Sequence, residues 1–342
     1  MKLNRIKQLQ KSISQPLLIK KSENLFYLTG QWFMQGFLLV KKNDVIFFGD
    51  GLEKVEDIKK TDRLKYIGKY LGRSKKVVPE DIFTFAEVHY LRAKCKGLRA
   101  KIERSPVDYQ RQVKDPSEIE LIGKSMRIVE KVFGQVRQQL KRKIWTEEKL
   151  AKFIKEAGFK LGAEDVSFPP IVASGAGAAV PHHVPSSKKL KPGESIIIDF
   201  GFKYKGYCSD FTRTVFLKSV TPKLEKAYNQ TERAYLESIK AAKSGMNAGK
   251  LYKKSVDILA EKKLDKYFIH SLGHGTGLEI HELPNLSPGS KDIMENGMVF
   301  SIEPGVYIPR IGGVRIEDLV YLDKGEVKKF INAPTKLKDN IV

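Results

Sequence analysis

The chain has 342 residues, of which 41% are hydrophobic and 10% aromatic, and its formal net charge is +22. This composition is typical of a folded protein of about two domains and excludes a disordered chain. The lysines are scattered and come with no zinc-finger, RNP or helix-turn-helix pattern, so the charge indicates a basic solvated surface and no specific nucleic-acid binding.

Residues 1–110 have the pattern of a small α/β domain. Helical spacing of apolar residues predicts helices at 5–13 and 82–94, and short apolar runs predict strands at 16–19, 37–40, 45–48 and, as an edge strand, 77–79. We expect a turn leading into a loop at residues 24–30. His89 stands alone and is interpreted as structural, so no site is predicted in this domain.

A domain boundary is predicted between Ser105 and Lys114, which gives a second domain of residues 111–342. Asp115 has the position of a helix N-cap, with Pro116 in the first turn and Glu118 completing a capping box. Three further helices are predicted, one opening at Thr146, one running from Thr221 to Gly245, and one opening at Asn247.

The second domain contains an internal repeat. Its first copy has a turn glycine, an apolar strand ending in Asp199, a glycine-containing hairpin and a second strand with Asp210. Its second copy has the same series, with Glu303 and Glu317 in the matching places. Each copy follows a pair of predicted helices. A two-fold repeat of this kind can close over a central site, with each half contributing ligands from equivalent strands.

The four carboxylates of the repeat, together with His274, form an oxygen-rich set with one nitrogen. Taken singly, each has a simpler explanation, such as capping of a turn by Asp199; the joint pattern is what indicates metal binding. An anion at the end of a buried apolar strand is costly unless a cation meets it. Such a set suits Mn²⁺, Co²⁺ or Fe²⁺, with Zn²⁺ also open. Two bridged metals generate a hydroxide and polarise a carbonyl, so the pattern predicts hydrolysis of an amide.

Cellular location follows from what the sequence lacks. The first twenty residues are polar and cationic, and no apolar run has the length of a signal peptide or a membrane span. Cys95 and Cys208 lie far apart and form no disulfide framework, which favours buried thiols in a reducing compartment. The sequence therefore predicts a cytoplasmic protein with no membrane partner.

The motifs of the second domain resemble those of the pita-bread metallopeptidases, the family of aminopeptidase P, prolidase and methionine aminopeptidase. They are PH at 181–182, IDFG at 198–201, SDFTRT at 209–214, GHGTGLEIHE at 273–282, SIEPG at 301–305 and RIED at 315–318. The resemblance covers residues from about 112 to the end. It implies an α+β fold, in which a pseudo-two-fold antiparallel sheet is covered by helices. Residues 24–30 resemble a creatinase-type N-terminal domain, which points to the Xaa-Pro branch of the family.

The resemblance implies a role for each matching metal ligand. Asp199 would chelate one metal, and Asp210 and Glu317 would bridge both. His274 and Glu303 would hold the second metal. Glu303 would also accept the proton of the attacking water.

The same resemblance implies roles for residues around the metals. His182 would assist proton transfer or substrate binding, and His281 would contact the scissile carbonyl and the tetrahedral intermediate. His270 matches a further pocket histidine of Xaa-Pro members, and Arg315 would bind substrate or steady the carboxylates. His183 is expected to point elsewhere and to be structural or exposed.

The substrate class implied by the resemblance is a peptide with proline in second position. Prolidases bind the free carboxylate of a dipeptide, and many carry arginine directly after the His-Glu-x-Pro segment, where this chain has Asn285. Asparagine cannot supply the bidentate charge of arginine. The sequence therefore favours an aminopeptidase P-like activity, with Xaa-Pro dipeptidase as the alternative, because Arg310 or Arg315 could take the same role.

Two other functional classes occur on the same fold. A non-catalytic pita-bread binding module would lack metal ligands, whereas all five are present here, and a metal-free creatinase-like hydrolase would lack the carboxylates. The family resemblance also implies a homodimer.

Overall fold

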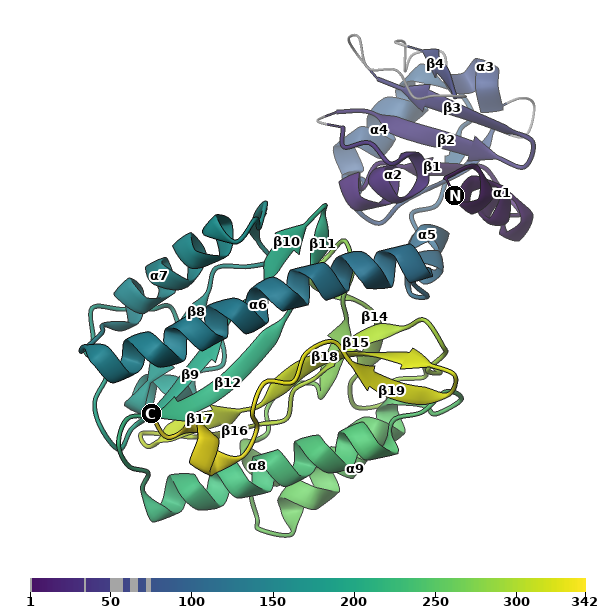
Figure 1. The fold of residues 1–342 in the computed structure, drawn as a ribbon. Helices are drawn as coiled ribbons and strands as arrows, with labels where there is room; N and C mark the ends of the chain where they lie inside the picture. The colour runs from purple at the N-terminus through teal and green to yellow at the C-terminus, as the bar shows by residue number, and fades with distance from the viewer. Residues whose placement is uncertain (1, 34, 50–57, 62–66, 72–74) are drawn as a thin grey trace. The chain divides into compact units, whose positions relative to one another are not determined.

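The structure, a computed structural model, describes residues 2–33, 35–49, 58–61, 67–71 and 75–342. The chain divides into an N-terminal unit, Met1–Arg111, and a C-terminal unit, Gln112–Val342 (Figure 1). Among the described residues, none of the helices combines the length and the apolar character needed to cross a bilayer.

The described part of the N-terminal unit has one mixed sheet with the strand order β4-β3-β2-β1-β5-β6. The strands are β1 (Leu17–Ile19), β2 (Phe37–Lys41), β3 (Asp44–Phe48), β4 (Lys59–Thr61), β5 (Lys76–Pro79) and β6 (Arg99–Ala100). The helices are α1 (Lys2–Ser12), α2 (Ser22–Thr29), α3 (Ile67–Leu71), α4 (Phe85–Lys94) and α5 (Pro106–Arg111). The apolar runs that predicted the first three strands face a buried cluster that includes Leu18, Leu39 and Ile46.

Two predictions for this unit were wrong. Residues 24–30 were expected as a turn and loop, but residues 24–29 belong to α2, and Gly30 is its C-cap in the left-handed conformation (φ 71°). Asn24 lies within this helix, and its buried side-chain amide donates to Glu80 (2.7 Å) and Asp108 (2.9 Å). The strand predicted as an edge, β5, pairs in parallel with β1 on one side and β6 on the other.

The C-terminal unit begins with a long helix, α6 (Pro116–Arg142), whose N-terminus has the predicted capping box of Asp115 and Glu118. It is followed by α7 (Glu147–Lys160), and the second helix pair is α8 (Pro222–Ala241) and α9 (Ala248–Ala260). The predicted end of α8 at Gly245 was wrong. The helix stops at Ala241 because Ser244 and Gly245 donate their backbone N–H groups to Gly325 and Met294.

The main sheet of the C-terminal unit is antiparallel, with the order β14-β13-β15-β18-β12-β9-β8 and β19 beside β18. Its strands are β8 (Ile171–Ser174), β9 (Ser195–Asp199), β12 (Phe211–Phe216), β13 (Gly273–Gly275), β14 (Glu282–Leu286), β15 (Val299–Ile302), β18 (Glu317–Asp323) and β19 (Glu326–Lys329). Two smaller sheets hold β7 (Asp165–Val166), β10 (Phe202–Tyr204) and β11 (Tyr207–Cys208), and β16 (Gly305–Ile308) with β17 (Gly312–Arg315).

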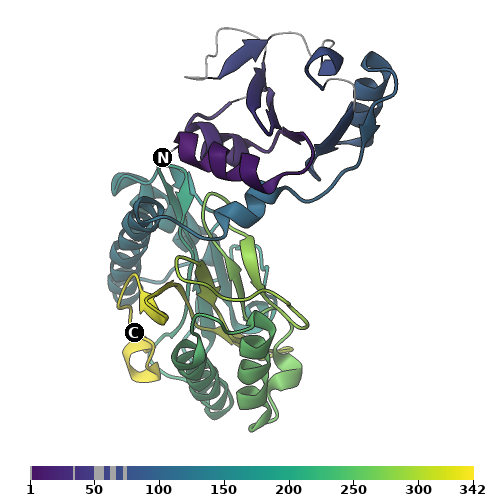
Figure 2. The same ribbon diagram turned by 90° about the vertical axis from the view of Figure 1, so that its right-hand side faces the viewer.

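The sequence repeat is a structural repeat. In the first copy β9 and β12 pair, with β10 and β11 between them in the chain; in the second β15 and β18 pair, with β16 and β17 between them. The copies join where Thr212 of β12 faces Glu317 of β18. The first helix pair precedes one copy and the second pair precedes the other, and Figure 2 shows α8 and α9 side by side.

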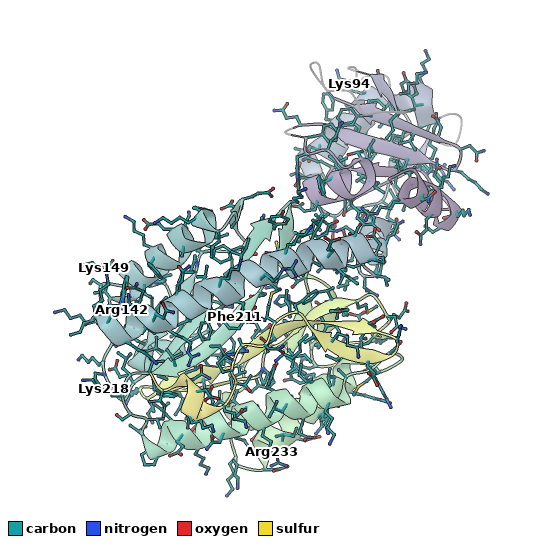
Figure 3. The ribbon with its side chains drawn as sticks, viewed as in Figure 1. Lys94, Arg142, Lys149, Phe211, Lys218 and Arg233 are labelled. Atoms are coloured by element: carbon teal, nitrogen blue, oxygen red, sulfur yellow. The ribbon has the colours of Figure 1, made fainter. Side chains whose placement is uncertain are left out.

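Phe211 lies in the interior of this unit beneath α6, as Figure 3 shows, with its ring 5.1 Å from that of Phe133. The labelled basic side chains Arg142, Lys149 and Lys218 project outward instead, and all three are exposed. Buried aromatic area stabilises the interior, while the positive charges stay in water.

Candidate metal centre and substrate cavity

The four predicted carboxylates meet at the middle of the main sheet. Asp199 ends β9, Asp210 directly precedes β12, Glu303 directly follows β15, and Glu317 begins β18. Thr212 is the register partner of both Asp199 and Glu317. Because the four strands are antiparallel neighbours, the end of one strand lies beside the start of the next, so the four carboxylates fall at one common end of these strands. The repeat therefore brings together residues that are more than 100 positions apart.

His274, on the adjacent strand β13, completes the group. Its Nε2 lies 3.5 Å from Asp210 Oδ2 and 3.4 Å from Glu303 Oε1. Asp210, His274 and Glu317 each offer one ligand atom, and these atoms lie within 4.8 Å of one another. Asp199 and Glu303 line the same cavity.

The donor set fits divalent metal. Asp199 Oδ1 and Glu317 Oε1 are buried and have no hydrogen-bond partner, which is costly for a carboxylate oxygen unless a cation binds it. His274 Nδ1 lies 3.0 Å from the carbonyl oxygen of Gly275, which can only accept, so Nδ1 carries the proton and Nε2 keeps its lone pair. That nitrogen is the one that faces the carboxylates, as a metal-ligating histidine requires.

Burial and mutual repulsion shift the pKa values of this group strongly. Burial raises the pKa of Asp210 well above its usual value, and the charges of Asp199 and Glu303 raise it further. Burial, followed by the charge of Asp210, does the same to the pKa of Glu317. Burial raises the pKa of Glu303 to about 7 and lowers the pKa of His274 to about 3. Without a cation, the four carboxylates cannot all be ionised at neutral pH.

Hydrogen bonds orient the carboxylates. Arg315 donates through Nη2 to Asp199 Oδ2 and through Nε to Thr212 Oγ1 (3.1 Å), and Thr212 Oγ1 donates to Glu317 Oε2 (2.5 Å). The Arg315 guanidinium therefore steadies Asp199 directly and Glu317 only through a threonine. Ser301 Oγ donates to Glu303 Oε1 (3.0 Å).

Three supporting residues were missed by the sequence reasoning: Thr212, Ser301 and Tyr307. Thr212 and Ser301 lie inside motifs that were recognised, so their position beside the carboxylates was the available signal. Tyr307, on β16, gave no such signal. Its hydroxyl accepts from Arg315 Nη1 (2.7 Å) and lies 2.8 Å from His270 Nε2.

A cavity of about 610 Å³ opens over the carboxylates. Its lining contains the metal-ligand candidates and His182, His183, His270 and His281. The apolar residues of the lining include Phe168, Pro169, Pro170, Pro181, Val184 and Ile280. All the predicted site residues therefore line one cavity, and its lining also offers apolar side chains.

The histidines of the cavity differ in their partners. The His281 ring meets the His274 ring edge-on at 4.2 Å, and burial lowers the pKa of His281. His270 donates through Nδ1 to the carbonyl oxygen of Ser271 (2.7 Å), and its Nε2 accepts a hydrogen bond from the Tyr307 hydroxyl (2.8 Å). Burial lowers the pKa of His270 to about 4, so this ring is neutral and both its nitrogens are engaged.

Comparisons with known proteins agree with this geometry. The model of metallopeptidase family M24 matches residues 120–324. A protein of Mycoplasma pneumoniae named "Putative Xaa-Pro aminopeptidase" is 36% identical over 329 residues, which cover 92% of this chain and 91% of that protein. The Xaa-Pro dipeptidase of Pyrococcus horikoshii is 32% identical over 344 residues, which cover 97% of each chain.

Solved structures confirm the predicted α+β pita-bread fold. The Xaa-Pro dipeptidase from Bacillus anthracis superimposes with a TM-score of 0.92 at 28% identity, covering 98% of this chain and 99% of that one. The X-Pro aminopeptidase from Thermotoga maritima superimposes with a TM-score of 0.85 at 27% identity, covering 96% and 99%. The predicted family resemblance is thus confirmed, and this chain is an enzyme that belongs to metallopeptidase family M24.

Proposed function

We propose that this enzyme is an exopeptidase that hydrolyses the Xaa-Pro bond at peptide N-termini, with aminopeptidase P-like specificity. The observation that supports it most is the convergence of four carboxylates, three of them buried, and one imidazole from two repeat halves, with two carboxylate oxygens left without a partner. The relatives named above act, by their names, on Xaa-Pro substrates.

In this proposal five residues hold two divalent ions, with Mn²⁺ or Co²⁺ expected and Zn²⁺ or Fe²⁺ open. They are Asp199, Asp210, His274, Glu303 and Glu317, of which Asp210 and Glu317 would be shared by both ions. The bound ions supply a hydroxide near neutral pH and polarise the scissile carbonyl. Metal content measured on the purified enzyme tests the number and the identity of the ions.

The chain's own residues handle the proton and the developing charge. Glu303, oriented by Ser301, accepts the proton of the attacking water. His281 donates to the oxyanion of the tetrahedral intermediate. His182, which lines the same cavity, binds substrate or passes the proton to the leaving amine, which in an Xaa-Pro bond is the proline nitrogen.

The supporting residues take different roles from those that bind substrate. Arg315 is only 4% exposed and its guanidinium is engaged by Asp199, Thr212 and Tyr307. We therefore assign Arg315 to the support of Asp199. His270 contributes the wall of the cavity, since both its ring nitrogens are engaged. The proline ring of the substrate packs on the apolar residues of the cavity lining.

The choice of aminopeptidase over dipeptidase rests on the charge of the cavity. Among the described residues that line it, Arg315 is the only lysine or arginine, and it is committed to Asp199. Asn285, in the place where many prolidases carry arginine, lines the cavity with a neutral amide. The free carboxylate of a dipeptide would meet no cation there, whereas the amide of a longer peptide needs none.

Hydrolysis of matched Xaa-Pro and Xaa-Pro-Xaa peptides, with Mn²⁺ or Co²⁺ and with a chelated control, tests the proposal. We expect metal-dependent release of the first residue, faster from the longer peptide. Absence of any metal-dependent release would support the non-catalytic module instead. Preference for the dipeptide would favour Xaa-Pro dipeptidase activity, the activity for which the Pyrococcus horikoshii relative is named.

A charge substitution sharpens the comparison. Asn285→Arg is expected to shift the ratio of kcat/KM toward the dipeptide by about tenfold, since an added arginine supplies the missing carboxylate partner. Asn285→Gln is the matched control, because it changes size without charge. An unchanged ratio in the arginine variant would place the peptide C-terminus elsewhere.

We also propose a domain organisation and an assembly. Residues 1–110 form a creatinase-like N-terminal domain and residues 111–342 the catalytic domain, and the enzyme is a cytoplasmic homodimer. Light scattering on the full chain measures the oligomeric state.

A further inference from the structure

Glu147, at the first position of α7, lies behind the wall of the substrate cavity and is fully buried. Its Oε1 accepts from the backbone N–H (2.8 Å) and the hydroxyl (2.6 Å) of Ser174. Its Oε2 accepts from His183 Nε2 (2.9 Å) and from the backbone N–H (3.1 Å) and the hydroxyl (2.7 Å) of Ser186. One carboxylate thus receives five hydrogen bonds from three places in the chain.

Two of the three partners flank one segment, residues 175–185, which we call the wall segment, and the third lies inside it. Ser174 directly precedes it, Ser186 directly follows it, and His183 lies within it. Residues 181–185 line the cavity, and His182 is among them. Glu147 therefore fixes both ends of the wall segment and one interior point.

The other side of the wall segment is packed against β17. A Cβ added at Gly313 would lie 2.0 Å from the carbonyl oxygen of Ala178, so the two backbones touch directly. Within the segment, a Cβ added at Gly177 would lie 2.9 Å from His183 Cε1, so the imidazole packs on the glycine. The His183 ring is held between the backbone of Gly177 and the carboxylate of Glu147.

The charge of Glu147 is compatible with this role. Burial alone would raise its pKa, but the hydrogen bonds from Ser174, His183 and Ser186 outweigh burial, and the pKa lies below its usual value. The carboxylate also lies at a helix N-terminus, where a negative charge is favoured. Since an ionised carboxylate only accepts, His183 Nε2 is the donor of their hydrogen bond.

We propose that Glu147, acting through His183, is a positioning residue that holds the wall segment so that His182 faces the metal centre. The inference rests on the proposed peptidase function and adds two residues to it. His182 itself is exposed on the cavity wall, so its direction depends on how firmly the backbone on either side is held. A displacement of about 1 Å there is enough to lower turnover by about 100-fold.

The test compares Glu147→Gln, His183→Ala and His183→Gln in the full-length, metal-loaded enzyme. We expect Glu147→Gln and His183→Ala to lower kcat/KM by about 10- to 100-fold with metal content unchanged. His183→Gln keeps a donor and is expected to recover most of the loss. Glu148→Gln, on the exposed side of the same helix turn, is the matched control and should match the wild type.

A double-substitution cycle separates positioning from general damage. In a His182→Ala background, Glu147→Gln is expected to change kcat/KM by less than about twofold, because the group that it positions is already gone. If the losses of kcat/KM caused by His182→Ala and by Glu147→Gln multiply in full, the proposal is overturned. Wild-type kcat/KM in both Glu147→Gln and His183→Ala would also overturn it. If Glu147→Gln does not fold, the comparison of His183→Ala with His183→Gln decides alone, and equal losses in both overturn it. A wild-type enzyme without metal-dependent release would instead refute the proposed function.

Discussion

Removal of the Tyr307 hydroxyl tests whether its hydrogen bonds with Arg315 and His270 stabilise the candidate metal centre. In Tyr307→Phe the ring stays and two hydrogen bonds are lost, one accepted from the Arg315 guanidinium at 2.7 Å and one donated to His270 at 2.8 Å. Tyr307 and Arg315 are 3% and 4% exposed, so water replaces the hydroxyl poorly. A bond to a charged group contributes about 1.5 to 3 kcal/mol and a neutral one about 1 kcal/mol. We expect the free energy of unfolding to fall by about 3 kcal/mol.

Urea unfolding of the chelated protein measures this change, with Tyr321→Phe as the control. Tyr321 is partly exposed and its ring lies tilted against that of Phe330 with the centroids 4.8 Å apart, so the control removes a hydroxyl outside the network. We also expect kcat/KM of the metal-loaded Tyr307→Phe enzyme to fall about tenfold, because Arg315 then holds Asp199 less firmly. A loss of stability below about 0.5 kcal/mol, the level of an ordinary surface substitution, would refute the reasoning.

Three further predictions concern the metal centre. Asp210→Asn is expected to abolish metal binding and activity while stabilising the metal-free protein by about 1 to 3 kcal/mol, since it removes a buried carboxyl group that burial and the neighbouring charges force to take up a proton. Metal analysis and urea unfolding check both effects, and full turnover would exclude Asp210 as a ligand. His281→Ala is expected to lower kcat at least about 100-fold with metal retained; parallel loss of metal and activity would contradict its role. Because the folded-state pKa of Glu303 is raised from 4.5 to about 7, the stability that its protonation provides is complete below pH 4.5 and is lost as pH rises through about 7. The melting temperature of the chelated protein should therefore fall between pH 5 and 8, and added Mn²⁺ should restore it at pH 8; a flat profile would contradict the shift.

The sequence predicted the elements whose signals are local. The capping box of Asp115 and Glu118 was found because its residues stand three positions apart and bond to each other's backbone. The apolar strands ending in a carboxylate were found because their repeat is visible in the order of the residues. Local signals failed at Asn24, where a residue typical of turns bonds instead to Glu80 and Asp108 inside the N-terminal unit.

The sequence by itself determined which residues are candidates for the chemistry: two pairs of carboxylates on repeated strands and a set of histidines near them. Only the tertiary structure decided how they pair. Arg315 stands two residues from Glu317 in the chain, yet its guanidinium binds Asp199, which is 116 positions away. Side-chain periodicity assigns a residue to one face of a strand but does not identify the neighbouring strand, so the partners Tyr307 and Glu147 became visible only once the two halves were folded together.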